Sequence, residues 1–239
     1  MTKVGRGVAI ITGASSGIGL ACSEAFLGAG FEVIGLARDF SKTTLDHLNF
    51  RKECMDLSCP GEIQKTLPGI LKSLTKPLKV LVSNAGIGKM GYLEQLADSD
   101  IERVIATNLL GHILVTKYCL PILKKQNECS DLIFVGSESA RQGGKEGSVY
   151  SASKFGLRGF AQSLRSECAK AGVRVNLINP GAVRSSFFDG LHFEPGPGDE
   201  HAIMPADVAT MALTAVNLRA GTVLDEINMS PLTKVWQSK

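Results

Sequence analysis

Apolar residues along this chain gather in short runs that alternate with longer stretches of helical period. Runs of strand length cover 7–12, 31–37, 49–55, 79–84, 131–137, 173–179 and 224–229. Stretches with helical spacing cover 17–28, 60–74, 99–125, 149–170 and 205–217. Runs such as VAII (8–11) are apolar without alternation, which is typical of strands that are covered on both faces. The order predicts an α/β protein: a Rossmann-type, doubly wound parallel sheet of about seven strands, flanked by helices on both faces.

Composition favours an ordinary globular protein. The chain has 239 residues, of which 44% are hydrophobic and 21% are charged, so it is long enough to bury a sizeable core. We find no internal repeat and no linker, and therefore predict a single domain over 1–239. The net charge is +3 with no basic run, which argues against a nucleic-acid partner.

The start of the chain and its cysteines indicate a cytoplasmic protein. Basic residues precede an apolar run, as in a signal peptide, but that run is only four residues long and ends in a glycine cluster. No stretch approaches the ~18 apolar residues of a membrane span, so no membrane contact is expected. The six cysteines form no CxxC pair and no Cys/His grouping. We expect reduced thiols and no metal site.

A glycine-rich turn follows the first predicted strand. In TGASSGIG (12–19) a strand runs into closely spaced glycines and then into a helix, which is the dinucleotide-binding arrangement. Glycines let the backbone approach a pyrophosphate, and the helix N-terminus offers it free N–H groups. A tight turn without a ligand is the alternative. The predicted cofactor-binding residues of this turn are Gly13, Ser15, Ser16, Gly17, Ile18 and Gly19.

The same letters also match the nucleophile elbow G-x-S-x-G of α/β-hydrolases, with Ser15 as nucleophile. That fold places several strands before the nucleophile, whereas only one precedes it here. The chain's histidines also lack a convincing local context; they are His47, His112, His192 and His201. The hydrolase interpretation is therefore disfavoured.

The end of the second strand bears on which dinucleotide would bind. An acid at this tip selects NAD through the ribose hydroxyl, and an arginine favours the 2′-phosphate of NADP. The sequence ARDF (37–40) holds both Arg38 and Asp39. Because the strand is expected to end at Ala37, Arg38 follows it directly and can fork onto a phosphate. We predict NADP, with NAD the less favoured cofactor; a solvated loop pair is the alternative.

Tyr150 and Lys154 stand four residues apart in YSASK, within the predicted helix 149–170, and so share one face. The pentapeptide alone fits a solvated turn as well as an acid–base pair. A free tyrosine has a pKa of about 10, and a nearby cation favours its phenolate. In the acid–base interpretation, Lys154 is expected to lower the pKa of Tyr150.

The chain resembles the short-chain dehydrogenase/reductase family over roughly 7–230. The resemblance rests on TGASSGIG, SNAG (83–86), Asn108, Ser137, YSASK and NPGAVRS (179–185), all in order. It implies hydride transfer between NADP(H) and a carbonyl compound or secondary alcohol. Tyr150 would pass the proton and Ser137 would donate a hydrogen bond to the same oxygen. Lys154 would hold the nicotinamide ribose, and Asn108 would position a water.

The resemblance also implies further cofactor contacts. Asp56 would border the adenine. Asn84, Ala85 and Gly86 would lie along the adenosine, with Asn84 also bracing the sheet. Beyond Pro180 and Gly181, the carboxamide end of the nicotinamide would contact Val183 and Ser185.

The substrate is left open. Segment 184–203 is expected to be a lid, in which Phe187, Phe188 and Phe193 line a pocket or pack on the body of the protein. Arg184 would meet a carboxylate or be exposed. Segment 226–236 resembles the ending of NADP-dependent 3-hydroxy acid dehydrogenases of the family, so the candidate substrates are a 3-hydroxy acid or another small carbonyl compound.

Two further expectations rest on the resemblance. Relatives pair through helices that correspond to 99–125 and 149–170, which implies a homodimer or homotetramer. The alternative to an enzyme is a non-catalytic NADP-binding redox sensor, and the intact set of Ser137, Tyr150 and Lys154 argues against it, because a sensor needs no proton donor.

Overall fold

The computed structural model describes residues 6–126 and 128–239. Residues 1–5, where the signal-peptide question arose, lie outside the described part. Within that part, seven strands form a parallel sheet in the order β3-β2-β1-β4-β5-β6-β8. Their bounds are Val8–Thr12 (β1), Glu32–Ala37 (β2), Phe50–Cys54 (β3), Leu78–Ser83 (β4), Ser130–Val135 (β5), Val173–Pro180 (β6) and Glu226–Met229 (β8). The order reverses between β1 and β4, and ligands of such sheets bind at this switch point, beyond the carboxyl ends of the strands.

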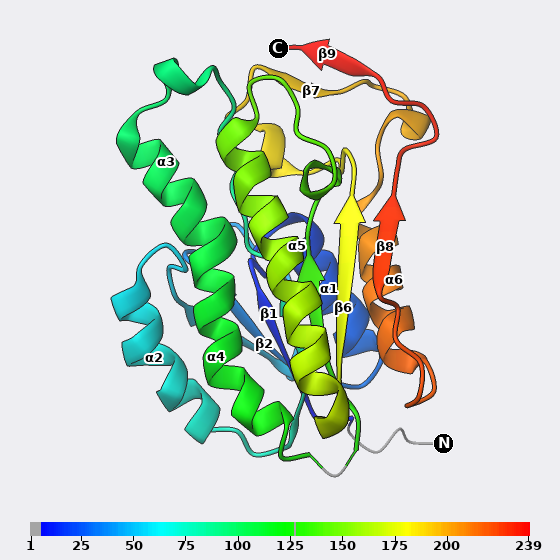
Figure 1. The fold of residues 1–239 in the computed structure, drawn as a ribbon. Coiled ribbons are helices and arrows are strands. Elements are labelled where there is room, and N and C mark those ends of the chain that lie inside the picture. The colour runs from blue at the N-terminus through cyan, green and yellow to red at the C-terminus, as the bar shows by residue number, and fades with distance from the viewer. Residues whose placement is uncertain (1–5, 127) are drawn as a thin grey trace.

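Helices cover both faces of the sheet, as the sequence predicts. α2, α4 and α5 lie on one face, and α1 and α6 lie on the other (Figure 1). α3 continues the line of α4 towards the carboxyl ends of the strands. The helix bounds are Gly17–Gly28 (α1), Pro60–Lys72 (α2), Asp98–Ile105 (α3), Gly111–Leu123 (α4), Ser148–Cys168 (α5) and Pro205–Asn217 (α6). The predicted Rossmann-type fold is confirmed.

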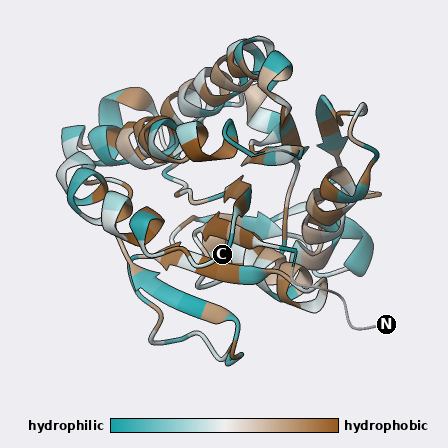
Figure 2. Cartoon of the chain, turned by 90° about the horizontal axis from the view of Figure 1, so that it is seen from below, coloured by the Kyte–Doolittle hydropathy of each residue, from teal (hydrophilic) through white to brown (hydrophobic). Residues whose placement is uncertain are grey.

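Two apolar layers explain why the central strands read as continuous apolar runs. All residues of β1 are buried, because Ile10 packs in the layer under α4 and α5 and Ile11 packs in the layer under α1. The central strands are accordingly hydrophobic in Figure 2, where the helices show mixed faces. β3, at the edge, is half-exposed. Burying both faces is the main driving force that fixes this sheet.

The predicted helix 99–125 is one helical run with a defect. Five residues between α3 and α4, Ala106–Leu110, form a π turn. Such turns occur frequently at functional sites, and Asn108 lies in this one. By length and composition the run Asp98–Leu123 could span a bilayer. In this fold it packs along β4 and against α2 and α5, as a core helix does.

The predicted lid is tied to the last strand of the chain. β7 (Phe193–Pro195) pairs antiparallel with β9 (Trp236–Ser238), a strand that the sequence pattern does not predict. This ribbon lies beyond the carboxyl ends of the main sheet (Figure 1). The segment 184–203 is therefore tied to the C-terminal strand through β7 rather than being a free loop.

Candidate active site

A cleft of about 940 Å³ opens along the carboxyl ends of β1, β2, β4, β5 and β6. It gathers almost every residue that the sequence singles out for the cofactor or the chemistry. Those lining it are Gly13, Ser15, Ser16, Gly17, Ile18, Arg38, Asp56, Asn84, Ala85, Gly86, Ser137, Tyr150, Lys154, Pro180, Gly181, Val183 and Ser185. Gly19 and Asn108 lie behind the lining and support it.

The glycine turn needs its glycines. Gly13 and Gly17 have φ values of 69° and 51°, in the left-handed region that favours glycine. A Cβ at Gly19 would lie 2.1 Å from the Gly13 carbonyl oxygen, so only glycine lets α1 begin this close to β1. Ser16 precedes α1 in extended conformation. The first N–H groups of α1 therefore point into the cleft, as an anion site requires.

The loop after β4 is held by buried hydrogen bonds. The Thr12 hydroxyl accepts from the N–H groups of Asn84 and Ala85, both at 2.9 Å. Asn84 Nδ2 donates to the Thr12 carbonyl at 2.9 Å, so its side chain braces β4 against β1. This leaves the backbone of Ala85 and Gly86 facing the cleft.

His112 anchors the same loop from α4. Its two ring nitrogens lie 2.6 Å from the Ser83 hydroxyl and 2.7 Å from the Ala85 carbonyl oxygen. Burial, and then the charge of Lys154, lower the pKa of His112 to about 3. The neutral ring donates from Nε2 to Ala85 and accepts at Nδ1 from Ser83. The sequence gives His112 no context, because both partners come from elsewhere in the chain.

Arg38 and Asp39 differ sharply in placement. Arg38 follows β2, which ends at Ala37 as expected, and lines the cleft. Asp39 lies outside the lining and accepts from Ser41, from its N–H at 2.8 Å and its hydroxyl at 2.6 Å. Those hydrogen bonds, the hydroxyl's first, lower the pKa of Asp39. The Asp39 carboxylate is thus hydrogen-bonded within its own loop, while Arg38 lines the cleft.

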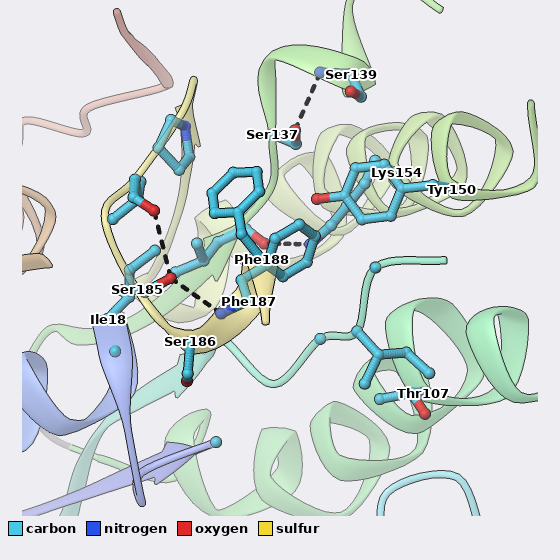
Figure 3. Close-up of a pocket in the computed structure, with 18 of the residues that line it drawn as sticks. Ile18, Thr107, Ser137, Ser139, Tyr150, Lys154, Ser185, Ser186, Phe187 and Phe188 are labelled. Carbon is cyan, nitrogen blue, oxygen red and sulfur yellow. Dashed lines mark hydrogen bonds between the residues drawn. The ribbon is translucent and has the colours of Figure 1, made fainter. Parts of the chain in front are cut away.

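Ser137, Tyr150 and Lys154 meet at the inner end of the cleft (Figure 3). Ser137 follows β5, and the other two stand one turn apart on α5. All three are buried. The Ser137 oxygen accepts from the Ser139 N–H at 3.1 Å, which leaves its own proton to donate. Lys154 Nζ lies 5.9 Å from the centroid of the Tyr150 ring and donates to the Val135 carbonyl at 3.0 Å.

The pKa of Tyr150 moves in the direction opposite to the expected one. Burial raises it to about 12; hydrogen bonding with Ser137 lowers it, and the Glu138 carboxylate raises it further. Burial also lowers the pKa of Lys154 to about 8. Burial is the largest influence on the phenol, and it acts against the lowering of the pKa that was expected from Lys154 and an oxidised nicotinamide together.

Asn108 is a brace in this structure. Its Oδ1 accepts from the Ile87 N–H and its Nδ2 donates to the Ile87 carbonyl, both at 2.9 Å. Nδ2 also donates to the Ser153 hydroxyl at 3.3 Å. The buried amide thus joins the π turn, the loop after β4 and α5. Thr107, which the sequence did not single out, reaches the cleft from the same turn.

Arg184 meets neither expectation for it. Its Nη2 donates to the carbonyls of Gly196 and Gly198, both at 2.9 Å. The guanidinium therefore links the start of the lid segment to residues near its end. The phenylalanines of the lid do line the cleft: Phe187, Phe188 and Phe193. The Phe187 ring lies 5.7 Å from the Tyr150 ring, centroid to centroid (Figure 3).

The chain is similar to known dehydrogenases and reductases. The family model described as short chain dehydrogenase matches residues 7–192. An NADP-dependent 3-hydroxy acid dehydrogenase of Schizosaccharomyces pombe is 30% identical, over 97% of this chain and 95% of the relative. A sepiapterin reductase of Chlorobaculum tepidum is 28% identical, over 94% and 96%. A 3-oxoacyl-[acyl-carrier-protein] reductase of Salmonella typhimurium is 32% identical, over 77% and 76%.

Solved structures share the fold at lower identity. An alcohol dehydrogenase from Thermococcus sibiricus, complexed with 5-hydroxy-NADP, superposes with a TM-score of 0.83 at 23% identity, covering 96% of this chain and 98% of that one. A 3-ketoacyl-(acyl-carrier-protein) reductase from Brucella melitensis, complexed with NADH, gives 0.82 at 22% identity, covering 95% and 98%.

Proposed function

The chain belongs to the short-chain dehydrogenase family of NAD(P)-dependent oxidoreductases, and we propose that it interconverts a carbonyl and a secondary alcohol with NADP(H). The observation that carries this proposal is the meeting of Ser137, Tyr150 and Lys154 at one end of a cleft whose other end is a glycine turn. A proton donor, a hydrogen-bond donor and a cation thus stand beside a dinucleotide-sized groove.

The cleft fits a dinucleotide at the glycine turn. A Cβ at Gly13 would lie 2.9 Å from Ala85 Cα, and one at Gly17 would lie 3.3 Å from Ser185 Cβ. Glycine at these positions thus lets the turn pack closely on Ala85 and Ser185, and the start of α1 offers its free N–H groups to a pyrophosphate. Asp56, Ala85 and Gly86 would border the adenosine, and Val183 and Ser185 would border the nicotinamide end.

The preference for NADP is supported by the loop after β2. Arg38 faces the cleft and Asp39 is held by Ser41, so a positive charge meets the region of the ribose 2′ position. The Schizosaccharomyces pombe relative is named as NADP-dependent. The two solved structures carry an NADP derivative in one case and NADH in the other, so the preference needs its own test.

In the proposed reduction, bound NADPH supplies the hydride that the carbonyl carbon receives. Tyr150 donates its phenolic proton to the carbonyl oxygen as charge develops there, which is worth ~10²- to 10⁴-fold in rate when the donor is well positioned. The Ser137 hydroxyl, whose oxygen already accepts from Ser139, donates a hydrogen bond to the same oxygen. Lys154 holds the nicotinamide ribose, and its charge favours the phenolate that Tyr150 becomes.

The raised pKa of Tyr150 is consistent with its role as proton donor in the reduction. A phenol with a pKa of about 12 holds its proton throughout the neutral range, as a proton donor must. In the oxidative direction the same group must first lose that proton, which requires extra positive charge nearby. The main chain of the π turn at Asn108 would position the water that reprotonates Lys154, because the Asn108 amide is engaged with Ile87.

A panel of carbonyl compounds and alcohols, run with each reduced or oxidised cofactor and followed by nicotinamide absorbance, tests the proposal. The expected result is turnover of some ketone or aldehyde with NADPH. The panel includes 3-oxo and 3-hydroxy acids, which the Schizosaccharomyces pombe relative's name suggests. Tight NADPH binding without turnover of any compound would instead favour a non-catalytic NADP-binding redox sensor.

The remaining expectations concern context. We infer a homodimer or homotetramer through α4 and α5, a cytoplasmic location, and no nucleic-acid or membrane partner. Their support is the family resemblance and the composition. The mass measured by light scattering tests the first of them.

A further inference from the structure

Phe187 reaches across the cleft from the lid to the opposite wall. A Cβ built at Gly88, in the loop after β4, would lie 2.5 Å from Phe187 Cζ, so the ring rests directly on the Gly88 backbone. On its other side the ring faces Tyr150, 5.7 Å away between centroids. Figure 3 shows Phe187 and Phe188 between the Ser185–Ser186 turn and Tyr150. A substrate that approaches the phenol must therefore lie against this ring or displace it.

The ring belongs to a continuous row of aromatic side chains. Phe188 lies 5.2 Å from Phe187 and 5.9 Å from Trp236, and Trp236 lies 5.2 Å from Phe193, between centroids. The tilted and edge-to-face arrangements are the favourable ones for aromatic pairs. β9 carries Trp236 and pairs with β7, which carries Phe193, so backbone hydrogen bonds fix the far end of the row.

Several charged groups at this end of the cleft already have partners. Among the residues that the structure describes, Lys234 pairs with Glu138 at 2.7 Å and His192 lies 3.5 Å from Glu146. Lys145 Nζ lies 5.4 Å from the centre of the Tyr92 ring. Arg184 is committed to the Gly196 and Gly198 carbonyls. An ionised carboxylate on the substrate would compete with these contacts unless it reached Arg103 on α3, which also lines the cleft.

A neutral polar group remains near Gly143 and Gly147, in the wall of the cleft. The Ser151 hydroxyl lines the cleft, is buried, and has no hydrogen-bond partner among the described residues. Buried polar groups are normally paired, so this hydroxyl fits a neutral donor or acceptor on whatever occupies the cleft. The surface that faces Tyr150 at this end is thus largely aromatic, with a neutral hydroxyl nearby.

We propose that the row Phe187–Phe188–Trp236 selects uncharged carbonyl compounds in which a flat ring adjoins the carbonyl carbon, with Phe187 as the residue that decides. This inference rests on the proposed function, since it names the substrate class of the same site. Once Phe187 turns away from Tyr150, a flat ring can lie face-on against it at little cost in packing, whereas a puckered ring of equal size cannot. Favourable ring–ring contact adds about 0.5–1.5 kcal/mol beyond buried area.

Three ketones of similar size separate these effects: acetophenone, cyclohexyl methyl ketone and 4-acetylbenzoate. With NADPH, the expected kcat/KM for acetophenone exceeds that of the other two by about 10-fold. In Phe187→Leu the preference for acetophenone over the cyclohexyl ketone shrinks to about twofold. Phe50→Leu, a half-buried aromatic of the edge strand β3 outside the cleft lining, is the control and keeps the full preference.

Gly88→Ala tests the geometry independently. The added Cβ collides with the Phe187 ring, so kcat/KM for acetophenone is expected to fall about 10-fold or more. Because a leucine lacks the Cζ atom that is struck, the double variant Gly88→Ala/Phe187→Leu is expected to regain the value of Phe187→Leu alone. Gly69→Ala, an exposed helix position with open space around it, keeps the wild-type value.

The outcomes distinguish the two claims. Equal or faster reduction of the cyclohexyl ketone or of 4-acetylbenzoate overturns the substrate class and leaves the oxidoreductase proposal standing. An undiminished preference in Phe187→Leu, or no rescue in the double variant, overturns the role of Phe187. Bound NADPH with no ketone or aldehyde reduced overturns both claims together.

Discussion

The ammonium of Lys154 lies 5.9 Å from the centre of the Tyr150 ring, yet its hydrogen bond goes to the backbone carbonyl of Val135. Both side chains are buried. Burial raises the pKa of the phenol to about 12 and lowers that of the ammonium to about 8, so the fold holds each group away from its charged form. The two groups are placed for chemistry at the expense of stability.

Lys154→Met is expected to stabilise the protein while abolishing turnover. Lowering the lysine pKa from 10.5 to about 8 corresponds to about 3 kcal/mol of lost stability in the wild type. Loss of the hydrogen bond to Val135 offsets part of that gain, because a charged hydrogen bond is worth about 1.5–3 kcal/mol. We expect a net increase of about 1 kcal/mol in the free energy of unfolding near pH 7, measured by urea denaturation.

The difference in unfolding free energy between Lys154→Met and the wild type should change with pH in a defined direction. The folded pKa of Lys154 is depressed, so the unfolded chain binds more protons between pH 8 and pH 10.5. The wild type therefore gains stability over this window while Lys154→Met does not. An advantage of the variant that grows with pH would contradict the assignment of a buried ammonium.

The central sheet was predictable because a strand that is buried on both faces has an unbroken run of apolar residues, such as 8–11. The glycine turn was predictable for a related reason: positive φ at Gly13 and Gly17 demands glycine. Both features depend on residues within one short stretch of sequence, so that stretch is enough to predict them.

Features that depend on distant partners were missed or mistaken. β9 is three residues long, and only its pairing with β7 makes it a strand. The bracing role of Asn108 was missed, because its partner Ile87 lies 21 residues away. Arg184 was expected to meet a carboxylate or be exposed, but it donates to the carbonyls of Gly196 and Gly198. The raised pKa of Tyr150 was not foreseen, because the i, i+4 spacing indicates a neighbouring charge and says nothing about the burial of the phenol.

Arg38→Ala is expected to weaken NADPH binding selectively. Loss of a charge-assisted contact of about 1.5–3 kcal/mol raises the Kd for NADPH roughly 10- to 100-fold. The Kd for NADH, which lacks the 2′-phosphate, stays within about threefold. Isothermal titration with each cofactor measures both, and Asp39→Asn is the matched control because that acid is held by Ser41. Equal losses for the two cofactors would rule out the NADP preference.

His112 is expected to make the fold acid-sensitive. Its folded pKa of about 3 lies below the ordinary value, so its stabilising contribution is complete above pH 6.5 and is lost as the pH falls. Between about pH 7.5 and pH 5 this amounts to about 2 kcal/mol of unfolding free energy. His112→Gln takes up no proton, so its stability should lack this part of the decline. The exposed His47→Gln variant should decline as the wild type does; identical acid profiles for all three proteins would exclude the role of His112.

The central claim is that the Tyr150 phenol donates the proton, and Tyr150→Phe tests it most directly, with NADPH affinity and NADPH-dependent ketone reduction measured on the same preparation. The account predicts that kcat/KM falls by ~10²- to 10⁴-fold while the Kd for NADPH changes by less than about threefold, and that Tyr118→Phe on α4 changes neither. Turnover by Tyr150→Phe at close to the wild-type rate would contradict the account.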